Sequence, residues 1–123
     1  MELNDITAAI VDSSLKVHTE LGPGLLESAY EACLMHELRK RGIQVRNQVD
    51  QPVHYDGIVI DVGYRLDLLV EDTVIVELKS VDAIAPIHKA QLLSYLKLSK
   101  KKIGLLLNFN VDRMKDGINR LAN

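Results

Sequence analysis

Apolar residues recur at helical spacing in two stretches near the N-terminus. Residues 4–22 show a stripe that continues over several turns and begins behind a possible cap formed by Asn4 and Asp5. Residues 25–42 show a second stripe, with basic residues in the last turn and Gly42 directly after it, as a helix C-terminus prefers. The sequence therefore predicts two helices, separated by the turn signal Gly-Pro-Gly at residues 22–24.

The middle of the chain has the aliphatic content of strands. Residues 43–55 form an extended segment interrupted by Pro52, which suits an edge strand or a bulge. Asp56-Gly57 is a hairpin turn signal, and further strands are predicted over residues 58–70, 73–81 and 103–109. A helix is predicted over residues 86–99, beginning at Pro86, and a short final helix is predicted from Arg113.

The order of these elements is helix, helix, three strands, helix, strand, helix. It predicts an α/β fold with a mixed sheet flanked by helices, because an antiparallel meander is followed by a helical crossover into the last strand. The chain has 123 residues, so we expect one domain over 1–123.

Strand alternation tests where the acids of residues 65–81 lie. If Glu71-Asp72 is a two-residue turn, Asp67 and Glu77 lie on opposite faces. If residues 71–73 form a three-residue loop, one face is aliphatic, and the other places Asp67 opposite Glu77 and Arg65 opposite Lys79. The second register segregates polarity better, and it brings two carboxylates to within about 5 Å of each other between Cβ atoms.

Two carboxylates placed opposite each other need a compensating cation or a shared proton. A hard ion such as Mg²⁺ binds carboxylate oxygens, and Lys79 would lie beside it to assist water or to hold a phosphate oxygen. The alternative is an exposed sheet face on which Arg65 and Lys79 neutralise the two acids in a salt-bridge ladder.

Composition and charge narrow the class of protein. The formal net charge is −2, without the basic balance of a dedicated nucleic-acid binder, and aromatic residues are few. The single cysteine, Cys33, excludes an intrachain disulfide. The sequence shows neither a signal peptide nor an apolar run of the ~20 residues that cross a membrane, so a cytoplasmic protein without membrane association is expected.

The spacing of the chemical groups resembles a known motif. Asp67, nine intervening residues and then Glu77-Leu78-Lys79 resemble the pattern of the PD-(D/E)XK nuclease superfamily. Gln91 and Tyr95 in the following helix are similar to the Q-x-x-x-Y spacing of its RecB-type members. The segment "GLLESAY" at residues 24–30 is similar to the signature of the GxxExxY family, a group of small bacterial proteins within that superfamily.

The resemblance implies a restriction-endonuclease-like αβββαβ core and a set of site residues. The metal, Mg²⁺ or Mn²⁺, would be held by Asp67, Glu77 and the Leu78 carbonyl, with Glu27 as an additional helix-borne acid. Lys79 would be the catalytic lysine, and Gln91 would orient Lys79 or the substrate beside Tyr95.

Three residues in these segments, Glu27, Tyr30 and His88, also have ordinary explanations. Glu27 at a helix start favours the helix dipole, and Tyr30 is better explained as a core residue. Gln91 among aliphatic neighbours needs a polar partner if it is buried. His88 could touch a substrate phosphate, but a solvated position at the helix start suits it as well.

The sequence thus favours a metal-dependent nuclease that hydrolyses phosphodiester bonds of nucleic acid, with DNA the favoured partner and a homodimer a candidate assembly. In this hypothesis Asp67, Glu77, Lys79 and Gln91 carry catalysis, and Tyr95 and His88 contact substrate. The main alternative is a catalytically inactive nuclease-like scaffold that binds a protein or nucleic-acid partner. A structural subunit without any site is the third possibility.

Overall fold

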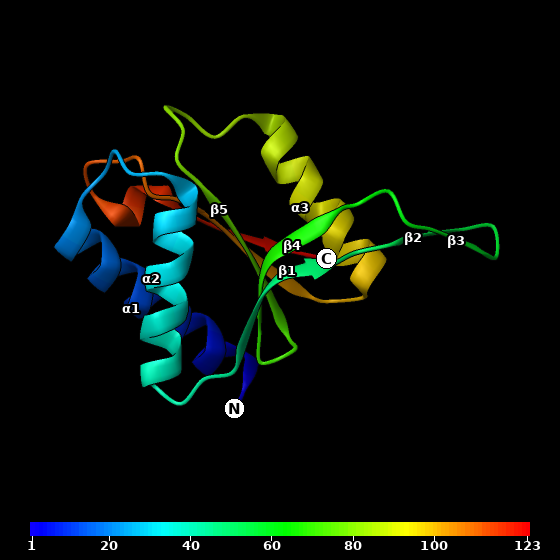
Figure 1. Cartoon of the computed structure of the whole chain (residues 1–123), viewed down its shortest axis with the longest axis horizontal. Coiled ribbons are helices and arrows are strands. Elements are labelled where there is room, and N and C mark those ends of the chain that lie inside the picture. The colour runs from blue at the N-terminus through cyan, green and yellow to red at the C-terminus, as the bar shows by residue number, and fades with distance from the viewer.

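The computed structural model describes residues 1–123, and it shows a mixed sheet between two layers of helices (Figure 1). The five-stranded sheet has the order β1-β4-β5-β6-β7, in which only β5 and β6 are parallel. A separate two-stranded sheet contains β2 and β3. The elements are α1 (Leu3–Leu21), α2 (Glu27–Lys40), β1 (Val45–Asp50), β2 (Val53–Tyr55), β3 (Ile58–Ile60), β4 (Arg65–Val70), β5 (Val74–Lys79), α3 (Pro86–Ser99), β6 (Ile103–Asn108), the 3₁₀ helix η1 (Met114–Gly117) and β7 (Ile118–Ala122).

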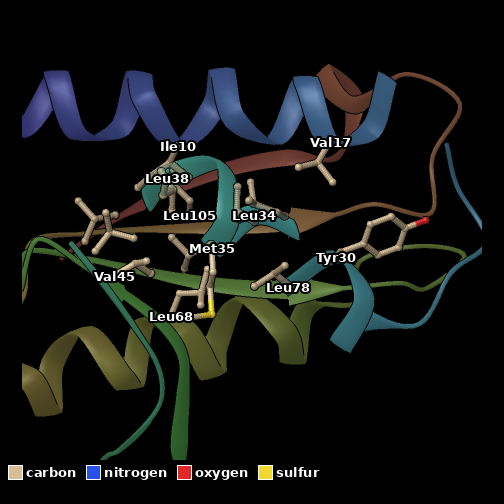
Figure 2. Close-up of a cluster of buried hydrophobic side chains, with 14 of the residues drawn as sticks. Ile10, Val17, Tyr30, Leu34, Met35, Leu38, Val45, Leu68, Leu78 and Leu105 are labelled. Atoms are coloured by element: carbon tan, nitrogen blue, oxygen red, sulfur yellow. The ribbon is translucent and has the colours of Figure 1, made fainter. Parts of the chain in front are cut away.

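Two hydrophobic cores hold the layers together, one on each face of the sheet. The larger core lies between the sheet and helices α1 and α2, and Figure 2 shows Ile10, Leu34 and Leu105 meeting there. The smaller core lies under α3 and includes Leu92, Leu96 and Leu106. Strands β5 and β6 are therefore buried on both faces, which explains why their sequences are almost continuously aliphatic.

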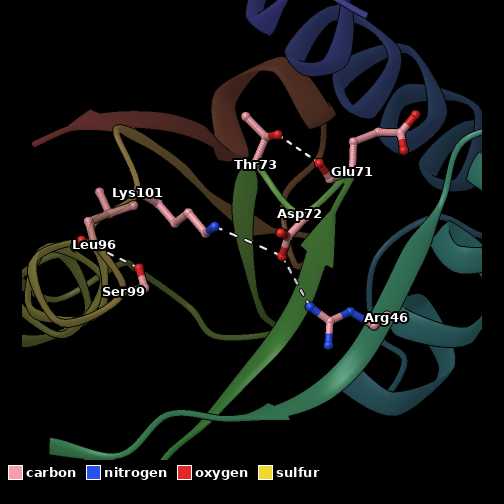
Figure 3. Close-up of polar contacts among 7 residues, drawn as sticks. All are labelled: Arg46, Glu71, Asp72, Thr73, Leu96, Ser99 and Lys101. Carbon is pink, nitrogen blue, oxygen red and sulfur yellow. Dashed lines mark hydrogen bonds and ion pairs between the residues drawn. The ribbon is translucent and has the colours of Figure 1, made fainter.

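The turn between β4 and β5 determines the register of the two acidic strands. Val70 pairs with Val74 and Leu68 with Val76, so residues 71–73 form the three-residue loop and the two-residue alternative is wrong. Glu71 and Asp72 both have φ of 51°, and the Thr73 hydroxyl donates to the Glu71 carbonyl. The Asp72 carboxylate accepts a hydrogen bond from Arg46 at 3.1 Å and lies 3.9 Å from the Lys101 ammonium (Figure 3).

The predicted order is correct through β6, with three local corrections. Residues 43–70 do not form two long strands, because the chain kinks at Gln51-Pro52 and again at residues 61–64, which separates β2 and β3 from β1 and β4. The N-cap residue of α1 is Glu2, not Asn4 or Asp5, and the Asp5 carboxylate instead accepts from the Glu2 N–H.

The third correction concerns the C-terminal tail, which is not a helix. After the short η1, residues 118–122 add β7 as an antiparallel edge strand along β6. Gly117 allows this turn, because a Cβ atom there would lie 2.0 Å from the Asn108 carbonyl oxygen. A local sequence pattern contains no signal for this approach between two backbones.

No helix of the chain is both long enough and apolar enough to cross a membrane.

Candidate active site

Asp67 and Glu77 meet where the pairing of β4 with β5 ends. The regular ladder stops at Leu68 and Val76. Beyond it, the Asp67 N–H donates to the Glu77 carboxylate at 2.7 Å, and the Leu78 N–H donates to the Asp67 carboxylate at 2.8 Å. The two acids are thus neighbours as predicted, but their side chains bridge the opened strands, and the two residues do not form an ordinary cross-strand pair.

The pairing of β4 with its other neighbour, β1, is interrupted at the same position. In the register of β1 with β4, Gln48 would lie opposite Asp67, yet this pair is skipped and Gln48 adopts a φ of 50°. Past this break Leu66 joins the core under α3, although alternation predicts it on the other face with Leu68. The double opening leaves room for the Asp67 carboxylate inside the sheet.

Burial and mutual repulsion raise the proton affinity of the acid pair. Glu77 is only 5% exposed, and burial followed by the charge of Asp67 raises its pKa to about 8. Burial also raises the pKa of Asp67. The ammonium of Lys79 opposes both shifts, so it lies within electrostatic reach of both acids.

The salt-bridge ladder, the alternative to a metal site, does not form. Arg65 pairs with Asp50 of β1 at 3.4 Å and not with Asp67, and Glu77 is buried, not exposed. Arg65 and Lys79 therefore do not form the exposed ladder, and the raised pKa values favour a proton or a bound cation on the acid pair.

Helix α2 adds two carboxylates to the surroundings of Asp67. Glu27, the first residue of the helix, is exposed, and Glu31 is half-buried one turn later. The charges of Glu31 and Glu27 both raise the pKa of Asp67, after the larger effect of burial.

Glu31 was not among the residues predicted from the sequence. Its carboxylate accepts hydrogen bonds from the side chains of Gln48 at 2.8 Å and Asn47 at 3.4 Å, which link α2 to the interrupted part of β1. The available signal was its spacing of four residues from Glu27, which places both acids on one helix face.

The backbone of β5 points the Leu78 carbonyl toward Asp67. The Lys79 carbonyl accepts from the Phe109 N–H, so residue 79 faces β6. Adjacent residues of a strand point their backbone groups to opposite sides, and the Leu78 N–H indeed donates to Asp67. The Leu78 carbonyl therefore faces β4 as well, on the side of the carboxylates.

Helix α3 brings Tyr95 to the acid pair. Tyr95 is buried, and its phenol pKa is raised first by burial and then by the charges of Glu77 and Asp67. Its ring lies 6.1 Å from the ring of Tyr64, centroid to centroid, and Tyr64 is 46% exposed. Tyr64 precedes β4 in an irregular segment, where strand alternation carries no signal for this contact.

Gln91 and His88 lie earlier on α3 and both are half-buried. Gln91 is one turn before Tyr95, on the same face of the helix. The His88 Nδ1 accepts the Ala85 N–H at 3.0 Å at the helix start, so only its Nε2 is free for a ligand.

Tyr30 belongs to the core and organises the loop before α2. Its ring is fully buried and stacks on Phe109 with centroids 4.5 Å apart. Its hydroxyl donates to the Gly22 carbonyl at 2.6 Å and accepts from the Leu25 N–H at 3.1 Å. The Leu25 carbonyl in turn accepts from the hydroxyl of Ser80, directly after β5. Tyr30 thus fixes the segment that leads into Glu27.

Replacing Tyr30 by Phe should lower the free energy of unfolding by about 1–2 kcal/mol, because two backbone groups lose their partner while the ring packing remains. Urea denaturation followed by circular dichroism measures this change. Tyr55→Phe, at a residue that is 68% exposed, is the control and should leave the stability unchanged. Equal stability of the two variants would contradict a role of the Tyr30 hydroxyl in holding the loop.

The fold and the acid pair together define a class of protein. A mixed sheet between helices, with carboxylates where two central strands separate and a lysine two residues after Glu77 on β5, is the arrangement of a restriction-endonuclease-like domain. The family model of the PD-(D/E)XK nuclease superfamily matches residues 4–121, so the chain belongs to that superfamily. Comparison with curated proteins and with solved structures found no match.

Proposed function

We propose that this protein is a divalent-metal-dependent nuclease that hydrolyses phosphodiester bonds of nucleic acid, with DNA as the favoured substrate. Within the superfamily we assign it to the GxxExxY group. The observation that carries the proposal is the buried pair of Asp67 and Glu77 at the opening of β4 and β5. Two acids with raised pKa values destabilise the fold at neutral pH, which argues for a role in function.

The donor set fits a hard divalent ion. Nucleases of this superfamily generally use such ions, and Mg²⁺ or Mn²⁺ would find carboxylate oxygens of Asp67 and Glu77 beside the Leu78 carbonyl. The side chains of His, Cys, Asp and Glu form no group of three or more in position to hold a metal ion. A site of two carboxylates and one backbone carbonyl is compatible with this, because Mg²⁺ keeps several waters.

Glu27 and Glu31 would belong to the surroundings of the ion. Glu27 is exposed at the start of α2, so its side chain is free to turn toward the site when a cation is present. Glu31 is held by two amides of β1, so we assign it to fixing α2 against the site.

The remaining residues have roles that follow from their chemistry. When bound, the metal ion would polarise the phosphate and activate water. The Lys79 ammonium, beside both acids, would stabilise the developing negative charge and hold a proton near the attacking water. Gln91 would orient Lys79 or the substrate by its amide, while Tyr95 and the free Nε2 of His88 would contact the phosphate backbone.

A calorimetric titration with Mn²⁺ and Mg²⁺ tests the metal site without a guess about the substrate. The wild-type protein should show saturable binding, and the Asp67→Ala/Glu77→Ala double variant should lose it, because both carboxylate ligands are gone. Asp12→Ala/Glu20→Ala removes two acids from α1, away from the acid pair. It is the matched control and should bind like the wild type.

Binding that is retained in the Asp67/Glu77 variant would refute the site. Absence of binding from the wild type would favour the non-cleaving scaffold, which the net charge of −2 already suits better.

We further propose that residues 1–123 act as one nuclease-like domain in the cytoplasm, and as a homodimer. Two copies would allow a small nuclease to cut both strands of a duplex.

A further inference from the structure

The β2–β3 hairpin is the least supported part of the fold. It projects from the body of the protein at the right of Figure 1 and forms a sheet of only two strands. Its turn, Asp56-Gly57, has φ of 51° and 77°, as a two-residue hairpin turn of type I′ requires. A two-stranded hairpin is marginally stable in water unless it packs against something.

The surface of this hairpin and of the segment after it is apolar on both faces. All three residues of β3 are exposed, among them Ile58 at 56% and Val59 at 64%. The exposed apolar residues of this region are Tyr55, Ile58, Val59, Ile60, Val62 and Tyr64. Half of the large hydrophobic residues that the chain leaves exposed thus gather in ten positions.

Charge argues against nucleic acid as the partner of this surface. Residues 52–64 include Asp56 and Asp61 but neither lysine nor arginine. Phosphate groups are held by cations, so two carboxylates on an apolar arm oppose contact with a nucleic-acid backbone. A protein surface that is itself apolar and poor in charge fits better.

Strand β3 has a free edge. In a two-residue hairpin the residues flanking the turn, Tyr55 and Ile58, exchange hydrogen bonds with each other, so the N–H and C=O of Val59 point away from β2. No third strand pairs with this edge. The other strand, β2, has a different neighbourhood, because the exposed His54 lines a hollow together with Lys97 and Lys100 near the end of α3.

We propose that β3 pairs antiparallel with β3 of a second copy of this chain, across a two-fold axis at Val59. The outward N–H of Val59 would then donate to the Val59 C=O of the other copy, the reverse bond would form as well, and Ile58 would lie opposite Ile60. Two hairpins become one four-stranded sheet, and each edge supplies the partner that the other lacks. This inference names the interface of the proposed homodimer and rests on that part of the proposed function.

The available area is sufficient for such a dimer. Taking about 200 Å² for a fully exposed tyrosine and about 100 Å² for an aliphatic side chain, the six residues offer about 400 Å² per copy. Homodimer interfaces are about 65% apolar, so the two copies would bury at most about 1,200 Å² in total, the value for complete coverage of all six residues. Stable interfaces begin at about this size.

Size-exclusion chromatography with light scattering tests the pairing over a range of about 1–200 μM protein, because dimerisation depends on concentration. The wild type should have twice the mass of one chain at the upper end. Val59→Asp should be a monomer at the same concentration, because two carboxylates would face each other across the axis. Ile87→Asp, which places the same charge at a residue of α3 that is 70% exposed, should remain a dimer.

A charge-swap experiment separates this explanation from misfolding. Val59→Lys alone should also be a monomer, whereas an equimolar mixture of Val59→Asp and Val59→Lys should recover the dimer mass.

Three outcomes would each overturn the proposal: a monomeric wild type, a dimeric Val59→Asp variant, or failure of the mixture to associate. A monomer that binds DNA less tightly after the Val59 substitutions would assign the arm to nucleic acid. The measured masses do not depend on metal, so this experiment tests the dimer interface independently of the proposed nuclease site.

Discussion

Replacing Glu77 by Gln is expected to raise the free energy of unfolding at about pH 9 by about 2–4 kcal/mol in the absence of divalent ions. Near pH 4 the variant and the wild type should be equally stable. Urea denaturation at a series of pH values, with a chelator present, measures the difference.

The sign follows from the pKa of Glu77, which is about 8 in the folded protein against 4.5 in its ordinary state. Between these values the folded protein binds the proton and the unfolded chain has released it, so stability falls as the pH rises. Above the upper value the wild type carries a buried charge beside Asp67. The amide of the Glu77→Gln variant would keep an oxygen that accepts the Asp67 N–H without that charge.

Glu20→Gln is the control, since it neutralises an exposed glutamate of α1 and should change the stability little at any pH. If the Glu77 variant is less stable than the wild type at high pH, the pair of Asp67 and Glu77 stabilises the fold. The interpretation of the pair as an active site then loses its main support. Addition of Mn²⁺ should stabilise the wild type at high pH and leave the variant unaffected, because only the wild type retains both carboxylates.

Substituting Lys79 by Ala is expected to reduce cleavage of nucleic acid by about 10²–10⁴-fold while leaving Mn²⁺ binding intact. In the proposed site Lys79 acts electrostatically on both carboxylates and is not a metal ligand, so its loss should remove charge stabilisation in the reaction and not the metal site. Single-turnover rates on supercoiled plasmid, single-stranded DNA and RNA in Mn²⁺ would measure the effect on each substrate class.

Lys97→Ala is the matched control, because Lys97 is an exposed lysine of α3 outside the acid pair. It should retain the wild-type rate. Equal rates for the two lysine variants would remove Lys79 from the catalytic group. Loss of Mn²⁺ binding in the Lys79 variant would show that the lysine holds the carboxylates in place instead.

Much of the fold was accessible from the sequence, for a simple reason. Strand side chains alternate with a period of two, so the choice of a three-residue loop was enough to bring Asp67 and Glu77 together, and the structure confirms that register from Val70 to Leu68. The helices were predicted because their apolar stripes recur at the helical period.

Other features depend on contacts between distant parts of the chain. The short tail was predicted as a helix, yet it lies as β7 along the free edge of β6, and the close approach of Gly117 to Asn108 that permits this has no local signature. The interruption at Pro52 was visible in the sequence, but the separate pairing of β1 and β2 was not, because a Pro in an extended segment does not say which strand each side will join.

The candidate site divides in the same way. The sequence by itself determined the order of Asp67, Glu77 and Lys79 on neighbouring strands, because strand geometry is local and periodic. Only the tertiary structure decided that β4 parts from both neighbours at Asp67, that Glu31 acts on Asp67 while Tyr64 contacts Tyr95, and that Glu77 is buried. The packing of α2 and α3 against the sheet sets these contacts and the raised pKa values that follow from them. Such packing depends on surfaces contributed by residues far apart in the chain, which no pattern within one segment records.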